Sequence, residues 1–151
     1  MKQLVIKQIE LQEELSTCAK ILVEAYNADP WNDEWTAEKA LEKLTCFYNS
    51  PKFIGYTASI DSEVVGCLVG NIEPYYTGDY FYLKEMFVTP KTQKQGVGKK
   101  LMETLKQQLS SIDIQTIILF TGKDYFPYDF YLKSGFNTME EMRMMHFGSE
   151  E

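Results

Sequence analysis

The segment from residue 79 to residue 121 constrains the fold more than any other part of this chain. It begins with "DYFYLKEMFV" (79–88), a run of aromatic and β-branched residues of the kind found in strands. After the turn "TQKQGVGKK" (92–100), apolar residues recur on one face of a helix, and "IQTIILFT" (114–121) is typical of a buried strand. This order predicts a right-handed crossover between two parallel strands.

Patterns in the rest of the chain complete a mixed α/β plan. The runs "FIGYTASI" (53–60) and "EVVGCLVGNIE" (63–73) flank Asp61-Ser62, which predicts a two-residue hairpin between antiparallel strands. Thr36 is the expected N-cap of a helix that ends near residue 48. We further expect strands over 3–9 and 139–147, and helices over 11–26 and 127–136. The sequence therefore predicts a single α/β domain over residues 1–151.

Composition and charge exclude several classes of protein. The net charge of −7 argues against a general nucleic-acid binder, whose surface should be basic, and favours the approach of a cationic partner. Neither a membrane-spanning run nor a secretory signal is found, so we expect a cytoplasmic protein with no membrane partner. Cys18, Cys46 and Cys67 lie in apolar segments, which predicts buried free thiols and no metal site.

The glycine turn has the composition of an anion site. The first amides of a helix have no partner inside the helix and carry partial positive charge. Gly96 and Gly98 would let the backbone curl close to a phosphate, and the lysines at 94, 99 and 100 add charge. A solvated loop, a nucleotide cradle and an acyl-CoA pyrophosphate cradle are the alternatives.

Two nucleotide motifs do not fit this turn. A P-loop needs glycine five residues before the Gly-Lys pair and Ser or Thr after it, but Gln93 and Lys100 stand there. The dinucleotide fingerprint needs a third small residue, and Leu101 occupies that position.

The six residues from Gln93 to Gly98 resemble the acyl-CoA motif of the GNAT superfamily of N-acetyltransferases, in which Arg or Gln opens the pattern. "EMFVTP" before the motif resembles that family's fourth strand, and "FYLKSGF" resembles its late tyrosine-containing helix. The resemblance covers residues 79–136 and implies a GNAT fold, with a mixed, mostly antiparallel central sheet and helices on both faces. It also implies acetyl-CoA as co-substrate and an amine as acceptor.

The resemblance implies which residues bind the cofactor. The pantetheine arm would pair with the backbone of Met86, Phe87 and Val88. Asp124 stands where many members have a cofactor-contacting asparagine, and a carboxylate cannot donate a hydrogen bond as an amide does. The pyrophosphate would lie on the turn amides of Lys94, Gln95, Gly96, Val97, Gly98 and Lys99.

Tyr131 occupies the position at which the family places a tyrosine that protonates the departing CoA thiolate and lies at the cofactor. For the base that removes the acceptor's proton, Glu85 on the fourth strand is our first choice, acting directly or through water. Glu73, Asp79 and Asp129 are alternatives, and His146 is expected to be structural. Since no cysteine has a histidine nearby in the sequence, we expect direct transfer without an acyl-enzyme.

The acceptor side is expected in "NADPWNDEWT" (27–36). Trp31, Trp35 and Glu34 combine indoles with a carboxylate, which could hold a cationic amine or cap the core. Two functions remain open: an N-acetyltransferase acting on a small cationic amine or a protein amino group, and a non-catalytic acyl-CoA-binding or regulatory module. The Met-rich run over 139–147 could pair as a strand across a homodimer.

Overall fold

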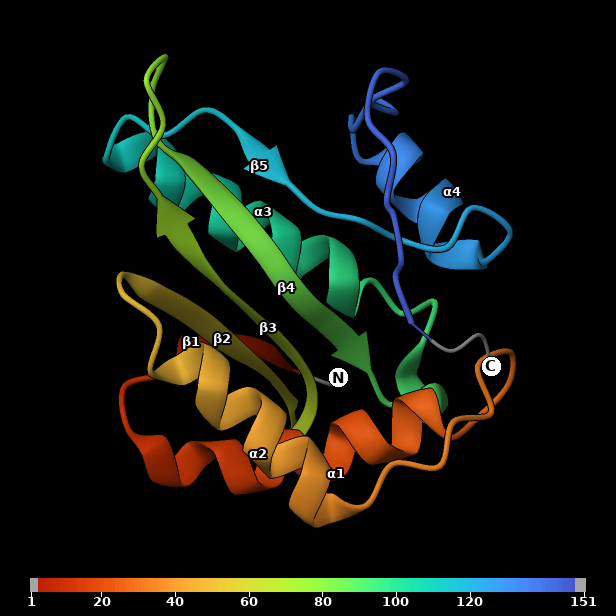
Figure 1. The fold of residues 1–151 in the computed structure, drawn as a ribbon. Helices are drawn as coiled ribbons and strands as arrows, with labels where there is room; N and C mark the ends of the chain where they lie inside the picture. Colours follow the sequence, from red (N-terminus) through yellow and green to blue (C-terminus); the bar gives the residue numbers. More distant parts are fainter. Residues whose placement is uncertain (1–2, 149–151) are drawn as a thin grey trace. The chain divides into compact units, whose positions relative to one another are not determined.

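The computed structural model describes residues 3–148, which form two compact units. The first unit ends at Leu119 and the second begins at Phe120. Figure 1 shows the elements of both. The first unit contains β1 (Leu4–Gln8), α1 (Leu15–Tyr26), α2 (Ala37–Tyr48), β2 (Phe53–Ile60), β3 (Glu63–Glu73), β4 (Tyr80–Val88), α3 (Val97–Ser111) and β5 (Ile117–Ile118). Two short 3-10 helices, η1 (Gln12–Glu14) and η2 (Pro90–Thr92), precede α1 and α3.

The five strands form one sheet in the order β1-β2-β3-β4-β5. The first four strands pair antiparallel, whereas β4 and β5 are parallel and connected through α3. The mixed, mostly antiparallel sheet and the crossover predicted from the sequence are therefore confirmed.

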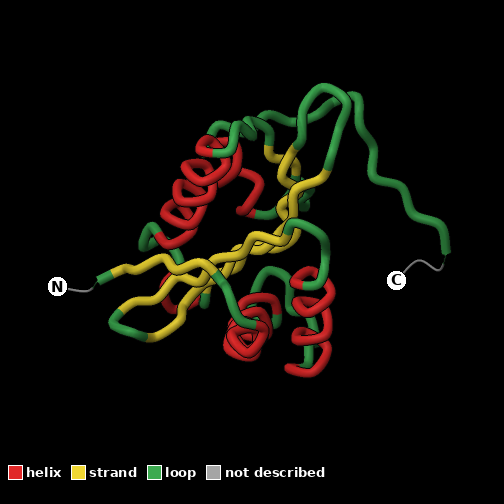
Figure 2. Tube along the Cα trace, turned by 90° about the vertical axis from the view of Figure 1, so that its left-hand side faces the viewer, coloured by secondary structure: helices red, strands yellow, loops and turns green. Residues whose placement is uncertain are grey.

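Helices cover both faces of this sheet, as Figure 2 shows for the first unit. Cys67 and Val69 of β3 and Phe87 of β4 belong to the buried cluster that α1 and α2 contribute. On the opposite face, Gly66 lies against the side chain of Val97 at the start of α3. Because strand side chains alternate between faces, a single strand supplies both cores.

Two local predictions are confirmed residue by residue. Asp61 and Ser62 both have positive φ angles, of 50° and 70°, as a two-residue hairpin turn of the favoured hand requires. The Lys39 backbone N–H donates a 3.1 Å hydrogen bond to Thr36 Oγ1, so Thr36 caps α2.

In the second unit, α4 spans Phe126–Lys133 and has Pro127 in its first turn. Gly135, with a φ of 98°, lies just beyond the helix, as predicted for a helix that ends in glycine. The strand expected over 139–147 is wrong, because this segment forms turns and irregular chain. Met144 and Met145 are 78% and 89% exposed there, and no strand in residues 3–148 pairs with them. The run over 139–147, which could pair as a strand across a homodimer, forms no strand in the described residues 3–148.

Two further expectations need correction. The strand predicted over 114–121 is only two residues long, because β4 pairs with it only at Phe81 and Tyr82. Cys18 and Cys67 are buried free thiols as predicted, but Cys46 is exposed on α2, where the helix turns it away from the sheet. An apolar residue in an apolar segment need not be buried, because its position on the helix decides which way the side chain points.

Gly70 provides a test of the sheet. A β-bulge lies beside it, since Val69 pairs with Glu85 but Gly70 pairs with Leu83. A Cβ at Gly70 would collide with the Tyr82 carbonyl oxygen and the Phe81 ring. We expect Gly70→Ala to lower the free energy of unfolding by about 1–3 kcal/mol, as overpacking does.

Urea denaturation of this variant and of Gly66→Ala measures the effect. At Gly66 the nearest atom to an added Cβ is the Val97 methyl at 3.1 Å, so the control should lose less stability. Equal losses of stability in the two variants would show that the close contacts at Gly70, beside the bulge, are not what destabilises the Gly70→Ala protein.

Candidate functional site

The glycine turn between β4 and α3 has the conformation that an anion site needs. Gly96 is the N-cap of α3 with a φ of 84°, a left-handed conformation that side chains rarely adopt. The first helical hydrogen bond runs from Lys100 N to Gly96 O at 3.0 Å. The amides of residues 97–99 therefore have no acceptor inside the helix and lie at its positive end.

Two glutamine side chains of the turn donate hydrogen bonds to backbone carbonyl oxygens that precede them. Gln93 Nε2 donates to the carbonyl oxygen of Val88 at 3.2 Å, which connects the turn to the end of β4. Gln95 Nε2 donates to the Lys91 carbonyl oxygen at 3.3 Å. The glutamine that opens the six-residue motif thus has a structural role within the chain itself.

Within residues 3–148, one edge of β4, the strand before the turn, is paired over only two of its residues. β4 pairs with β3 along its length, but with β5 only at Phe81 and Tyr82. Along residues 83–88, no described strand pairs with the β5 side of β4. Met86, Phe87 and Val88 all lie in this stretch, and unpaired backbone groups at such an edge can accept an added extended segment.

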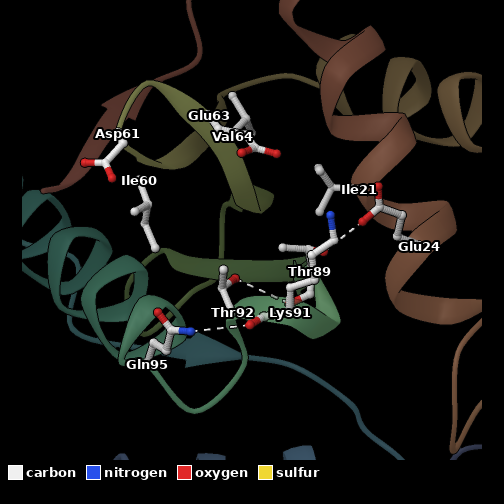
Figure 3. A pocket seen from close by; sticks show the side chains of 10 residues that line it. All are labelled: Ile21, Glu24, Ile60, Asp61, Glu63, Val64, Thr89, Lys91, Thr92 and Gln95. Atoms are coloured by element: carbon white, nitrogen blue, oxygen red, sulfur yellow. Dashed lines mark hydrogen bonds between the residues drawn. The ribbon is translucent and has the colours of Figure 1, made fainter. Parts of the chain in front are cut away.

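A cavity of about 290 Å³ lies between α1, the β2–β3 hairpin and the β4–α3 connection (Figure 3). Its walls include the carboxylates of Glu24, Asp61 and Glu63, and Glu24 accepts a 2.8 Å hydrogen bond from Thr89 Oγ1. Lys91 also lines the cavity, but three carboxylates outweigh one ammonium and the walls are acidic on balance, which suits a phosphate less well than the turn does.

Glu85 lies at the bulge of β4 and faces α1 and α2. The Tyr26 hydroxyl donates a 2.8 Å hydrogen bond to Glu85 Oε1, and Lys43 Nζ lies 3.3 Å from Oε2. Only 14% of the Glu85 side chain is exposed. A carboxylate with one neutral and one cationic partner is held in a fixed orientation, and each partner comes from a different helix.

The structure brings two of the three predicted acceptor residues to the surroundings of Glu85. Trp31 packs edge-on against Tyr26, with ring centroids 5.2 Å apart. Trp35 lies beneath the Lys43 ammonium, 5.2 Å from the ring centroid, and its indole N–H donates to Asp33. Glu34 is exposed and does not join this group.

Aromatic and charged side chains also lie close together at the C-terminal end of β3 and the N-terminal end of β4. The Tyr80 hydroxyl donates a 2.7 Å hydrogen bond to Glu73, and this bond raises the pKa of Tyr80. Burial and the Glu73 charge raise the pKa of Tyr82. Lys84 Nζ lies 3.5 Å from the centroid of the Tyr82 ring. This end of the sheet already holds one ammonium on an aromatic face.

In the second unit, Tyr131 lies on α4 between Phe130 and Phe136, with ring centroids 5.4 Å away on both sides. Tyr131 is buried, whereas Asp124 lies exposed in the turn before α4. Asp129 and His146 are also exposed.

The thiols offer little for catalysis. A hydrogen bond with Cys18 and complete burial raise the pKa of Cys67 well above its usual range, so its thiolate is scarce. Among residues 3–148, no three His, Cys, Asp or Glu side chains lie together so as to hold a metal ion. None of the helices described is long and apolar enough to cross a membrane.

Tyr26 and Lys43 are the site residues that the sequence did not indicate. Tyr26 falls on the apolar stripe of α1 and looks like a core residue, while Lys43 falls on a helix with several lysines. The acid-rich loop that follows Tyr26 is the sequence feature that points to it.

The fold and site define an acyltransferase-like α/β protein, and comparison with known proteins identifies the family. The family model described as acetyltransferase (GNAT) family matches residues 11–136, across both units. The chain belongs to the GNAT family of acetyltransferases. A search of curated protein sequences finds no significant match.

Solved structures share the fold over nearly the whole chain. An aminoglycoside acetyltransferase from an uncultured soil metagenomic sample, in complex with sisomicin, has a TM-score of 0.69 and 21% identity, covering 98% of this chain and 96% of that one. The aminoglycoside N-acetyltransferase AAC(6')-Iy in complex with CoA has a TM-score of 0.74 and 15% identity, covering 97% and 96%. An integron cassette protein from the mobile metagenome of V. cholerae has a TM-score of 0.79 and 17% identity, covering 97% and 93%.

Proposed function

We propose that this chain transfers an acetyl group from acetyl-CoA directly to a primary amine, either on a small cationic molecule or on a protein or peptide. The observation that carries the proposal is the uncovered edge of β4, which leads into a glycine turn with outward-facing helix amides. Membership of the GNAT family and the CoA-bound neighbour support an acyl-CoA at this edge. A non-catalytic acyl-CoA-binding module on the same fold is the alternative.

The cofactor would use main-chain groups. Its pantetheine arm would pair with the backbone of residues 86–88, and its pyrophosphate would lie on the amides of residues 94–99. Lys94, Lys99 and Lys100 are exposed and supply positive charge around these amides. The side chains of Phe87 and Val97 are buried in the two cores, which suits contacts made through the backbone.

In this reaction the acceptor ammonium loses two protons on becoming an amide nitrogen, and the departing thiolate gains one. In our proposal Glu85 takes a proton from the acceptor ammonium, directly or through water, and the amine then attacks the thioester carbonyl. The carbon–sulfur bond breaks and the thiolate leaves and takes a proton from Tyr131. The second proton that the nitrogen loses then passes through water to restore the phenol. A phenol suits this step because it stays protonated at neutral pH.

Charge and aromatic surface favour a cationic acceptor. Glu85 and Glu73 lie on the same face of the sheet as Tyr80 and Tyr82, and the chain carries a net charge of −7. The neighbour that binds sisomicin and the CoA-bound neighbour are both aminoglycoside acetyltransferases, which supports trying polycationic amines first. Trp31 extends the aromatic wall through its contact with Tyr26.

The decisive experiment measures CoA release from acetyl-CoA in the presence of a panel of amines that includes aminoglycosides, polyamines and peptides. The proposed function requires amine-dependent release together with an acetylated product. If acetyl-CoA binds in calorimetry but no amine accelerates CoA release, the non-catalytic module is the better description.

Glu85→Gln tests the proposed base. Glutamine keeps the size of the side chain but cannot accept a proton, so we expect kcat to fall by roughly 10²-fold, the lower end for a general base, because water can partly substitute. Acetyl-CoA affinity should remain unchanged. The matched control is Glu73→Gln, which removes a carboxylate already engaged by Tyr80. A greater loss in the Glu73 variant would assign the base to Glu73.

A further inference from the structure

Lys43 has a position that the proposed transfer does not use. Its ammonium lies 3.3 Å from Glu85 Oε2, 5.2 Å from the Trp35 ring centroid and 6.0 Å from that of Phe47. Its side chain is 37% exposed. A primary ammonium is therefore held by a carboxylate and two aromatic rings, which are the contacts that an acceptor amine needs.

This ammonium is paired with the carboxylate that we propose as the base. Any external acceptor must bring its own amine to the same oxygen atoms of Glu85. Glu85 directly precedes residues 86–88, along which the pantetheine arm would lie, so the thioester would end beside this carboxylate. Lys43 thus has the same reacting group as an amine substrate, a primary amine, and holds it beside the proposed base.

Resting on the proposed function, we propose that the chain acetylates its own Lys43 when no external amine is present. Lys43 Nζ loses a proton to Glu85, and its lone pair attacks the acetyl carbonyl carbon to form an amide bond. The carbon–sulfur bond breaks and CoA leaves with that electron pair. The thiolate takes up the second proton that Nζ loses on becoming an amide nitrogen. A tethered amine reacts as though present at high concentration, so the external acceptor need not be known.

Acetylation would also change the site. An acetylated lysine carries no charge, so the ion pair between Lys43 and Glu85 would be lost, while the Tyr26 hydrogen bond to Oε1 could remain. Glu85 would then be free of its cationic partner when an external ammonium arrives.

The chain provides a matched control lysine on the same helix. Lys39 lies one turn before Lys43, and its ammonium pairs with Glu42 at 3.0 Å. Both of those side chains are largely exposed, at 66% and 64%. Lys39 reports simple chemical acetylation of a solvent-exposed lysine by acetyl-CoA.

The test incubates the purified chain with acetyl-CoA alone and maps acetylated lysines by mass spectrometry over time. We expect one acetyl group per chain at Lys43, at least ten times faster than at Lys39. The rate at Lys43 should fall by roughly 10²-fold in Glu85→Gln, as for loss of a general base. Lys43→Arg should remove the modification and Lys39→Arg should not.

Several results would overturn the proposal. Similar acetylation of Lys43 and Lys39, modification of Lys84 in place of Lys43, or an unchanged rate in Glu85→Gln would each show that the site does not direct the reaction. If Lys43 stays unmodified while added amines are acetylated, self-acetylation is wrong and the proposed function stands. If acetyl-CoA neither binds nor donates to any amine, both proposals fail.

Discussion

Tyr131→Phe should lower kcat by roughly 10²- to 10⁴-fold, the usual scale for losing a positioned general acid. The ring keeps its packing between Phe130 and Phe136, so the variant should fold normally. Only the proton donor is removed. Since the interaction with the thiolate exists mainly in the transition state, the loss should appear in kcat more than in KM.

Tyr128→Phe is the matched control for this experiment. Tyr128 lies on the same helix, and its hydroxyl is 2.6 Å from Thr138 Oγ1, so its phenol has a structural hydrogen bond. That variant should shift the melting temperature and leave kcat near normal. Wild-type turnover in Tyr131→Phe, measured on a preparation of known thermal stability, would rule out the acid role.

Gly98→Glu should weaken acetyl-CoA binding by several kcal/mol, because bulk and negative charge would replace open backbone where phosphate is expected. The fold should tolerate the change. Gly98 has no positive φ and lies in the first turn of α3, where an acidic residue stabilises a helix. Calorimetry with acetyl-CoA measures the effect.

Two variants separate charge from bulk at this position. Gly98→Ala adds a methyl group without charge and should cost less affinity than Gly98→Glu. Gln107→Glu adds the same charge at an exposed position further along α3 and should leave affinity almost unchanged. An unchanged affinity in a folded Gly98→Glu protein would disprove the pyrophosphate assignment.

Local sequence patterns determined much of the architecture. Strands β2 and β3 have the predicted bounds, because alternating β-rich runs and a turn with two positive φ angles are decided by near neighbours in the chain. The Thr36 cap and the glycine turn before α3 are local for the same reason. The six-residue motif that starts at Gln93, read together with "EMFVTP" before it and "FYLKSGF" after it, carried the resemblance to the family that the family model then showed.

Elements whose formation depends on distant partners were less well predicted. β5 has only two residues because only two residues of β4 pair with it. The apolar composition of 114–121 does not show how many residues will find a partner. The run over 139–147 contains apolar residues but has no strand to pair with in the described chain. Apolar side chains predict burial only where another element supplies the covering surface.

The sequence by itself placed Glu85 on the strand before the glycine turn, which made it a candidate base. Only the tertiary structure decided what surrounds it. Tyr26 on α1 and Lys43 on α2 meet the two oxygen atoms of Glu85 although they lie far from it along the chain. Trp31 packs against Tyr26 and Trp35 lies beneath the Lys43 ammonium, so both indoles join the group through these two residues. Such meetings follow from how α1 and α2 pack on the sheet, and helical periodicity shows which face is buried but not which side chain of another element that face will contact.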